Sequence, residues 1–376
     1  MKTKERWSYL SRAPRVVWDL VVRAEQRFDF DFMPVVVKGM SRAQRWNVLR
    51  AGLNLGYRRR APWSWPLHMQ VELTSFCNVR CPVCPVGNES LTRPAQAIDV
   101  QLFDRLIGEV GDYLLTLALW GWGEPLLHPR LERLLTIARR YPAAVLVSTN
   151  GQNLNQPKVQ QALRNAPPTF LIVAIDGLTD DTNSVYRKGA KLAPAIEGAR
   201  ALAEWKAKSG SRLPVLHFRF LAMRQNEHEI PRIRSFASDN GFDMVSIRGL
   251  SIIDSPESAH SDLLPAGRSL RAYDYGHRNR LRRGDFVCQH AFTYPTVLAD
   301  GTVVACEQDF NGNHPYGVFS AERSFADIWF GREAAEVRGT VRDHPAQYSS
   351  CRNCPFADRK QNTCSIEGYM LRPTEV

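Results

Sequence analysis

The sequence predicts an α/β protein in which short, buried parallel strands alternate with amphipathic helices. Short apolar runs alternate with longer segments of helical periodicity between residues 68 and 248, which is typical of βα units on a parallel sheet. The hydrophobic share of 44% is ordinary for a globular protein. No apolar run reaches the roughly 18 residues needed to cross a bilayer. At 376 residues, the chain is long enough for two or three structural units.

Six strands and five helices are expected in this region. The strands are expected at 68–73, 114–120, 144–148, 170–175, 215–221 and 244–248, and the helices at 99–110, 129–140, 155–164, 193–208 and 227–239. The longest apolar runs lie at 113–119 and 170–175, and continuous runs of this length indicate strands that are buried on both faces.

Residues 1–66 differ from the rest of the chain in charge. They contain 14 Lys and Arg against 5 Asp and Glu, whereas the whole chain has a net charge of +11. One helix is expected over 15–28, with its apolar residues on one face. A second is expected to begin after Ser41, a good N-cap, and to carry Trp46, Leu49 and Leu53 on one stripe. The sequence therefore predicts a basic, helical N-terminal extension.

Three roles remain open for this extension. Its apolar face can pack on the body of the protein and leave the arginines in solvent. A helix with arginine on one side and apolar residues on the other also suits an anionic membrane surface. Tryptophan and tyrosine interleaved with positive charge suit RNA or another polyanionic partner, and a peptide partner is a further alternative.

Eight cysteines occur in a chain whose N-terminus, with Lys2 and Lys4, lacks a continuous apolar segment. A secretory signal is therefore not expected, and the protein is expected to be cytoplasmic. The cysteines follow CxxxCxxC and CxxC patterns, which in a reducing compartment indicate metal or cluster ligation rather than disulfides.

The most informative group is Cys77, Cys81 and Cys84, on a loop that follows the first expected strand. Three thiolates on one loop suit three irons of a [4Fe–4S] cube and leave the fourth iron open to a substrate or cofactor. A zinc ion with an outside fourth ligand, or simply buried thiols, are the alternatives.

Three further motifs close apolar runs downstream: Trp122-Gly123-Glu124-Pro125, Ser148-Thr149-Asn150-Gly151 and Ile175-Asp176-Gly177. Together with the cysteine loop, this ordered set resembles the radical S-adenosylmethionine (radical SAM) superfamily over residues 67–250. The resemblance implies a partial (β/α)6 TIM-like barrel, with its chemistry at the C-terminal ends of the strands.

The resemblance also implies cofactors and site residues. Cys77, Cys81 and Cys84 would hold a catalytic [4Fe–4S] cluster whose open iron binds S-adenosylmethionine. Reductive cleavage would give a 5′-deoxyadenosyl radical, which takes a hydrogen atom from the substrate. The expected cofactor-binding residues are Val83, Gly123, Glu124, Ser148, Asn150 and Asp176. Val83 and Trp122 depart from the family pattern, in which an aromatic residue and a glycine are usual.

Several of these positions have a simpler interpretation. Ser148 and Asn150 also fit an ordinary Asn-Gly turn, and Asp176 a turn-forming Asp-Gly. Arg187 is expected to be exposed, with neutralisation of a carboxylate as the alternative. The sequence identifies no catalytic acid or base.

A second cysteine-rich block, with Cys288, Gly301, Cys306, Cys351, Cys354 and Cys364, resembles a SPASM or twitch auxiliary-cluster region. A hairpin is expected over 296–304, with an Asp-Gly turn. Five cysteines suffice for one auxiliary [4Fe–4S] cluster. Its expected ligands are Cys288, Cys306, Cys351 and Cys354, with Cys364 as an alternative, and a zinc ribbon is the competing interpretation. His290 and His314 are not assigned as ligands.

The expected organisation is a helical extension at 1–66, a radical SAM core at 67–250, a linker at 251–284 and a small Cys-rich auxiliary-cluster domain at 285–376. The expected function is oxidative modification, by dehydrogenation or cross-linking, of a small molecule or peptide. An electron donor such as flavodoxin or ferredoxin is implied. The Arg-rich stretch 278–283 suggests an anionic substrate. Alternatives are a redox-neutral radical SAM epimerase or mutase, and a zinc-stabilised nucleic-acid-binding protein.

Overall fold

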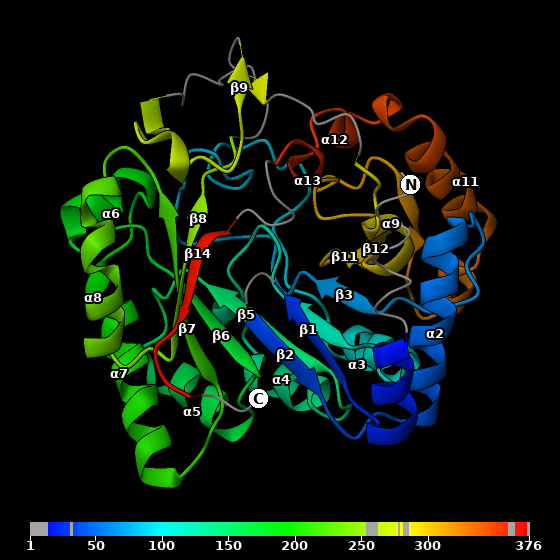
Figure 1. Ribbon diagram of the computed structural model, residues 1–376, viewed down its shortest axis with the longest axis horizontal. Helices are drawn as coiled ribbons and strands as arrows, with labels where there is room; N and C mark the ends of the chain where they lie inside the picture. The colour runs from blue at the N-terminus through cyan, green and yellow to red at the C-terminus, as the bar shows by residue number, and fades with distance from the viewer. Residues whose placement is uncertain are drawn as a thin grey trace.

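The centre of the molecule is one ten-stranded sheet in a computed structural model that describes residues 14–30, 33–252, 262–276, 279–280, 286–359 and 365–373 (Figure 1). Its order is β13-β12-β11-β3-β4-β5-β6-β7-β8-β14. The six central strands run parallel to one another. They are β3 (His68–Val71), β4 (Thr116–Leu119), β5 (Ala144–Thr149), β6 (Phe170–Ala174), β7 (Val215–Ala222) and β8 (Met244–Gly249). All six predicted strands are confirmed.

The helices between these strands are also confirmed, with ends that differ by a few residues. They are α3 (Val100–Val110), α4 (Leu131–Ala138), α5 (Pro157–Asn165), α7 (Leu192–Ser209) and the pair η3 (Glu227–Arg232) and α8 (Ile233–Asp239). A further helix, α6 (Asp180–Tyr186), was not predicted. The helices lie along the outer face of the sheet, and the main apolar core fills the space between (Figure 1). This arrangement is a partial barrel of the predicted kind.

The N-terminal extension differs from the prediction. The predicted helix over 15–28 ends at Arg23 with the short segment η1 (Asp19–Arg23), because Ala24 adopts a left-handed conformation with φ 51°. The chain then forms an antiparallel pair, β1 (Gln26–Phe30) and β2 (Met33–Val37). Residues 27–30 alternate polar and apolar side chains, which suits a strand, but the predicted helix took Phe28 as the last residue of its apolar face.

The β1–β2 pair closes one end of the barrel. Met33, Val35 and Val37 of β2 are buried in a cluster with residues from the first half of several central strands, among them Leu146 and Phe170. β1 and β2 cross in front of these strands (Figure 1). Part of the extension therefore packs on the body, as one of the three predicted roles requires.

Helix α2 (Arg42–Tyr57) begins as predicted, with Ser41 as N-cap in a capping box with Gln44. Two residues of its predicted stripe face solvent, whereas the third, Leu49, is half-buried against the body. Trp46 is 63% exposed and Leu53 is 54% exposed. The residues that the helix buries include Gln44, Asn47 and Asn54.

The C-terminal region extends both edges of the barrel sheet. β11 (Thr296–Val297) pairs parallel with β3, and β12 (Thr302–Val304) and β13 (Pro315–Val318) follow antiparallel. The predicted Asp-Gly hairpin is thus confirmed, with Gly301 at φ 87°. β14 (Ser365–Met370) pairs antiparallel with β8. The auxiliary region is therefore hydrogen-bonded into the same sheet as the core.

The remaining elements are short, apart from one helix. They are η2 (Pro125–Leu127), η5 (Arg268–Leu270), β9 (Tyr275–Gly276), β10 (Asn279–Arg280), α9 (His290–Thr293), α10 (Phe325–Trp329), α11 (Arg332–Asp343), η6 (Pro345–Gln347), α12 (Ser349–Arg352) and α13 (Pro355–Asp358). Within the described ranges, none of the helices is long and apolar enough to span a membrane.

Candidate functional site

The loop that carries Cys77, Cys81 and Cys84 follows β3 and is held by close backbone contacts. The amide of Arg80 donates to the carbonyl of Lys188 at 3.0 Å, and the amide of Cys84 donates to the carbonyl of Cys81 at 3.1 Å. A Cβ on Gly87 would lie 2.1 Å from the Cys81 carbonyl oxygen, so only glycine fits there. The sequence thus folds the three thiols into one compact loop.

The end of β4 contacts this loop directly. The amide of Glu124 donates to the Phe76 carbonyl at 2.9 Å, and the Thr74 hydroxyl donates to the Glu124 carbonyl at 2.8 Å. Cys84 Sγ lies 3.8 Å from the carbonyl oxygen of Trp122. A Cβ on Gly123 would lie 2.1 Å from the Thr74 carbonyl oxygen. The glycine at this position is therefore what lets the two strand ends approach.

The end of β5 joins the same group through the carboxylate of Glu124. Thr149 Oγ1 donates to Glu124 Oε1 at 2.7 Å, and the amide of Asn150 donates to Oε2 at 2.7 Å. Asn150 Nδ2 also lies 3.4 Å from Cys77 Sγ and 2.9 Å from Asn78 Oδ1. Three consecutive parallel strands thus converge on the cysteine loop.

Glu124 is buried, and burial raises its pKa, although the hydrogen bonds from Asn150, Leu126 and Thr149 oppose this shift. Thr149 was not among the predicted residues. Its neighbours Ser148 and Asn150 were chosen instead because a threonine inside a strand is unremarkable in a sequence. Ser148 is half-buried.

Asp176 follows β6 and forms a buried ion pair with Arg187, whose Nε lies 2.7 Å from Asp176 Oδ2. The Arg187 side chain is only 11% exposed, so the prediction that it is exposed is wrong. The buried carboxylate of Asp176 provides the physical reason, because a charge in the interior needs a partner. Asp176 Oδ1 accepts from the Leu221 amide at 2.8 Å, which fixes the carboxylate between β6 and β7.

The thiols themselves are in a desolvated environment. Burial raises the pKa of Cys81 to about 12, while the positive charge of Arg187 opposes this shift. Burial also raises the pKa of Cys77 and of Cys84. A thiolate is stable here when positive charge from Arg187 or from bound metal balances it. The donor set and its surroundings therefore fit an iron–sulfur cluster.

Val83 lies on the apolar side of the cysteine loop. It is buried in a cluster with Tyr186, Met223 and Leu250. This predicted cofactor residue thus supplies an apolar wall next to the thiols.

Four of the five C-terminal cysteines lie in the described residues: Cys288, Cys306, Cys351 and Cys354, all with free thiols. Cys306 interacts electrostatically with Cys288 and Cys354, which places these three near one another. Cys364 falls outside the described residues. His290 is half-buried next to the rings of Tyr294 and Phe356, and desolvation lowers its pKa to about 4. The ring of His314 stacks on that of Tyr348 at 3.8 Å. In the described part of the chain, no three His, Cys, Asp or Glu side chains converge on a position for a single metal ion.

Trp122 connects the two cysteine groups. Its carbonyl oxygen lies near Cys84 Sγ, and its indole Nε1 donates to the carbonyl of Glu307 at 2.9 Å. Glu307 follows Cys306 in the sequence. The residue that departs from the usual glycine thus supports the contact between the core and the auxiliary region.

A partial β/α barrel with three thiols at the carboxyl ends of its strands, and a second group of thiols beside it, defines an iron–sulfur enzyme. Residues 71–237 match the radical SAM superfamily, and residues 288–355 match the SPASM iron–sulfur cluster-binding domain. The chain therefore contains a radical SAM domain followed by a SPASM domain. These domains imply a catalytic [4Fe–4S] cluster, S-adenosylmethionine and auxiliary iron–sulfur binding.

Two curated relatives have low sequence identity to this chain but align over most of its length. The tungsten-containing aldehyde ferredoxin oxidoreductase cofactor-modifying protein of Pyrococcus furiosus is 22% identical over 320 residues, covering 77% of this chain and 88% of that protein. PqqA peptide cyclase of Streptomyces rochei is 23% identical over 329 residues, covering 81% and 86%.

Among solved structures, Streptococcus suis SuiB bound to S-adenosylmethionine has a TM-score of 0.60 and 15% identity, covering 86% of this chain and 78% of that one. At this identity, the likeness confirms the fold.

We expect Gly123→Ala to reduce formation of 5′-deoxyadenosine at least tenfold. The new Cβ would overlap the Thr74 carbonyl oxygen and push the β4 end away from the cysteine loop. The matched control is Gly108→Ala, because Gly108 lies on α3 with nothing within 4 Å of its Cβ position. Anaerobic assay of both reconstituted variants by liquid chromatography tests the prediction. Equal activity of the two would contradict it.

Proposed function

We propose that this protein is a radical SAM enzyme that oxidatively modifies a peptide, by dehydrogenation or cross-linking. The observation that carries the proposal is the convergence of Cys77, Glu124 and Asn150 from three successive strand ends, beside a second cysteine group joined to the same sheet. A small-molecule substrate is the alternative within the same class.

Each residue of the core site has a proposed role. Cys77, Cys81 and Cys84 hold the catalytic cluster, which together with S-adenosylmethionine supplies hydrogen-atom abstraction when bound. Glu124, fixed by Thr149 and Asn150, presents buried negative charge next to the loop and suits a cationic amino group. Gly123 and Ser148 are proposed to line the same cofactor site, and Val83 to give apolar contact to the cofactor's base.

The carboxylate of Asp176 already has two partners in the protein. Its ion pair with Arg187 and its bond to the Leu221 amide support the β6–β7 end of the site, so we propose that it positions the site as well as facing the cofactor. The electrostatic interaction of Arg187 with Cys81 and Cys84 places positive charge next to the thiols, where it favours a negatively charged cluster.

The auxiliary cluster is proposed to bind Cys288, Cys306, Cys351 and Cys354, with Cys364 as the alternative. Oxidation of a substrate releases a second electron after the first hydrogen atom is removed, and a nearby cluster can accept it. The contact of Trp122 with Glu307 supports such closeness between the two cysteine groups. A flavodoxin or ferredoxin is the proposed electron donor.

Peptide chemistry is favoured by the names of the relatives. PqqA peptide cyclase of Gluconobacter oxydans is 27% identical over 184 residues, which is 48% of this chain and 49% of that protein. The mycofactocin maturase of Mycobacterium ulcerans is 28% identical over 138 residues, or 37% of each. A structure of SuiB bound to its precursor peptide shares the fold.

The predicted anionic substrate site at 278–283 is not supported by the arginine that the structure describes. Arg280 is buried, and its Nε lies 3.3 Å from Asp358 Oδ2. It also donates to the carbonyl of Ile252 at 2.9 Å and thereby ties the end of the core to the auxiliary region. Arg278, Arg282 and Arg283 lie outside the described residues. Arg280 therefore already has an internal anionic partner.

The test begins with anaerobic reconstitution, followed by assay of 5′-deoxyadenosine with dithionite and S-adenosylmethionine. Short peptides encoded beside the gene are then co-expressed with the enzyme and examined by mass spectrometry. A product lighter by two hydrogen atoms supports oxidation. A product of unchanged mass in ordinary water that gains one deuterium when the reaction runs in deuterium oxide supports the redox-neutral epimerase. Zinc without iron, and no 5′-deoxyadenosine, would favour the zinc-stabilised nucleic-acid-binding alternative.

A further inference from the structure

Helix α2 buries several amides against the barrel, while part of its apolar surface faces solvent. Gln44 Nε2 donates to the Leu114 carbonyl at 2.8 Å, and Asn47 Nδ2 donates to the Tyr113 carbonyl at 3.1 Å. The amide of Trp65 donates to Asn47 Oδ1 at 2.9 Å. These bonds hold the helix on the barrel. Val48, Leu49 and Leu55 are half-buried against the core and add to this attachment, whereas other large apolar side chains of the helix remain in solvent.

The exposed side of α2 continues onto the neighbouring helical segment 14–23. Trp46, Leu53 and Tyr57 of α2 are 63%, 54% and 69% exposed. In segment 14–23 four more side chains are exposed: Val17, Trp18, Val21 and Val22. Arg45 Nη1 donates to the Leu20 carbonyl at 3.3 Å, and the two helical segments lie side by side in Figure 1. These seven residues are called the apolar face below.

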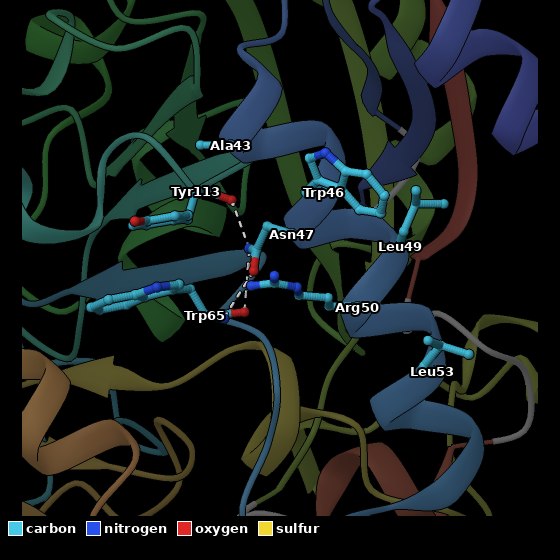
Figure 2. Close-up of a pocket in the computed structure, with 8 residues that line it drawn as sticks. All are labelled: Ala43, Trp46, Asn47, Leu49, Arg50, Leu53, Trp65 and Tyr113. Carbon is cyan, nitrogen blue, oxygen red and sulfur yellow. Dashed lines mark hydrogen bonds between the residues drawn. The ribbon is translucent and has the colours of Figure 1, made fainter.

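A shallow pocket of about 410 Å³ lies along α2 at this face (Figure 2). Trp46, Leu49 and Leu53 line it from the helix, and Trp65 and Tyr113 line it from the barrel. The rings of Trp65 and Tyr113 stack at 4.7 Å between centroids. More than half of the large apolar side chains that are exposed in the described residues belong to 14–66. A concentration of this kind marks a binding surface rather than scattered exposure.

Positive charge surrounds the apolar face. Exposed arginines flank it at Arg15, Arg23, Arg42, Arg50 and Arg59. The carboxylates are largely hidden: Asp19 and Glu25 are buried and lie within 4 Å of arginine, which leaves Asp29 as the exposed acid in the described part of 14–66. The surface thus presents tryptophan and aliphatic residues with a cationic rim.

We propose that the apolar face binds the surface of an anionic lipid bilayer, with the apolar side chains at the headgroup boundary and the arginines on acidic headgroups. Tryptophan prefers this boundary, and each arginine near an anionic surface adds favourable free energy. A second copy of the chain fits less well, because a two-fold contact would bring the two cationic rims together. The contacts of the cysteine loop described above are made by other residues than these seven, so this surface is distinct from the proposed active site.

The experiment is flotation of the reconstituted holoenzyme, under anaerobic conditions, with vesicles of phosphatidylcholine alone or mixed with phosphatidylglycerol. We expect binding to the mixed vesicles that weakens as salt rises from about 50 mM to about 500 mM. Trp46→Ser/Leu53→Ser should lower the partition coefficient at least tenfold. Arg42→Glu/Arg50→Glu should lower it at least as much for mixed vesicles. These residues lie outside the α2 contacts with the barrel, so both variants should fold.

The matched control is Val318→Ser/Met370→Ser, which removes exposed apolar residues from the auxiliary region and should bind within twofold of wild type. Wild-type protein that stays with the vesicle-free fraction would overturn the proposal. So would Trp46→Ser/Leu53→Ser binding as wild type does. A dimer in analytical ultracentrifugation that this variant abolishes, or salt-sensitive binding to polyuridine without vesicle binding, would assign the face to another partner.

Discussion

Replacing Cys77, Cys81 and Cys84 together by alanine should abolish formation of 5′-deoxyadenosine and remove one cluster. Iron should fall from about eight to about four atoms per chain, since each cube contains four irons. The physical reason is the geometry of the loop, since these thiols lie at the strand ends beside Asn150 and Arg187. Iron and sulfide analysis, with chromatography of the S-adenosylmethionine products, makes the measurement.

The matched variant is Cys288→Ala/Cys306→Ala, which should lose the other four irons and still cleave S-adenosylmethionine in the absence of substrate, since about four irons remain in the core. Oxidation of a substrate should then fail, because the proposed acceptor of the second electron is missing. If the core triple variant keeps its deoxyadenosine activity, the assignment of the catalytic cluster to Cys77, Cys81 and Cys84 is wrong.

The strands and the cysteine loop could be predicted from the sequence because both depend on local patterns. Apolar runs define β3–β8, and each motif follows the strand that positions it. Since the carboxyl ends of parallel strands meet at one edge of a sheet, the convergence of Glu124 and Asn150 on Cys77 follows from order alone.

Contacts between distant segments could not be predicted in the same way. Neutralisation of a carboxylate by Arg187 was an alternative from the sequence, but only the fold identifies Asp176 as that carboxylate. Thr149 looks like an ordinary strand residue in the sequence, and only the fold brings its hydroxyl to 2.7 Å from Glu124 Oε1. In α2, periodicity correctly gave one apolar stripe but not which of its residues face solvent. The buried side was decided by amides that satisfy backbone groups of the barrel.

The auxiliary region is attached to the core by a buried ion pair that also could not be seen in the sequence. Glu72 follows β3, and both of its oxygens accept from Arg93 Nη2, at 3.0 and 2.8 Å. Glu72 Oε2 also accepts from the Ala299 amide at 3.1 Å, and Arg93 Nε donates to the Phe310 carbonyl at 2.6 Å. The pair therefore joins the first core strand to two segments of the auxiliary region.

We expect Arg93→Met to lower the free energy of unfolding by about 3–5 kcal/mol, because it leaves the buried Glu72 carboxylate without its cation. Glu72→Gln/Arg93→Met should recover part of this loss, since the neutral amide still accepts from Ala299. Anaerobic urea titration of reconstituted protein, followed by circular dichroism, measures the difference. A wild-type midpoint for Arg93→Met would show that the pair adds no stability.

The pH dependence of this variant has a defined sign. Burial raises the pKa of Glu72 above its ordinary value of 4.5, and Arg93 opposes that shift, so its removal should raise the pKa further. A carboxyl with a raised folded-state pKa destabilises the fold progressively as pH rises through the range between its unfolded and folded pKa values. The loss of unfolding free energy in Arg93→Met, relative to wild type, should therefore be smallest near pH 4.5 and grow towards neutral pH. In Glu72→Gln/Arg93→Met this growth should disappear, because the titrating group is gone. If Arg93→Met loses the same unfolding free energy at acidic and neutral pH, Arg93 stabilises the contact between core and auxiliary region through Phe310 rather than through Glu72.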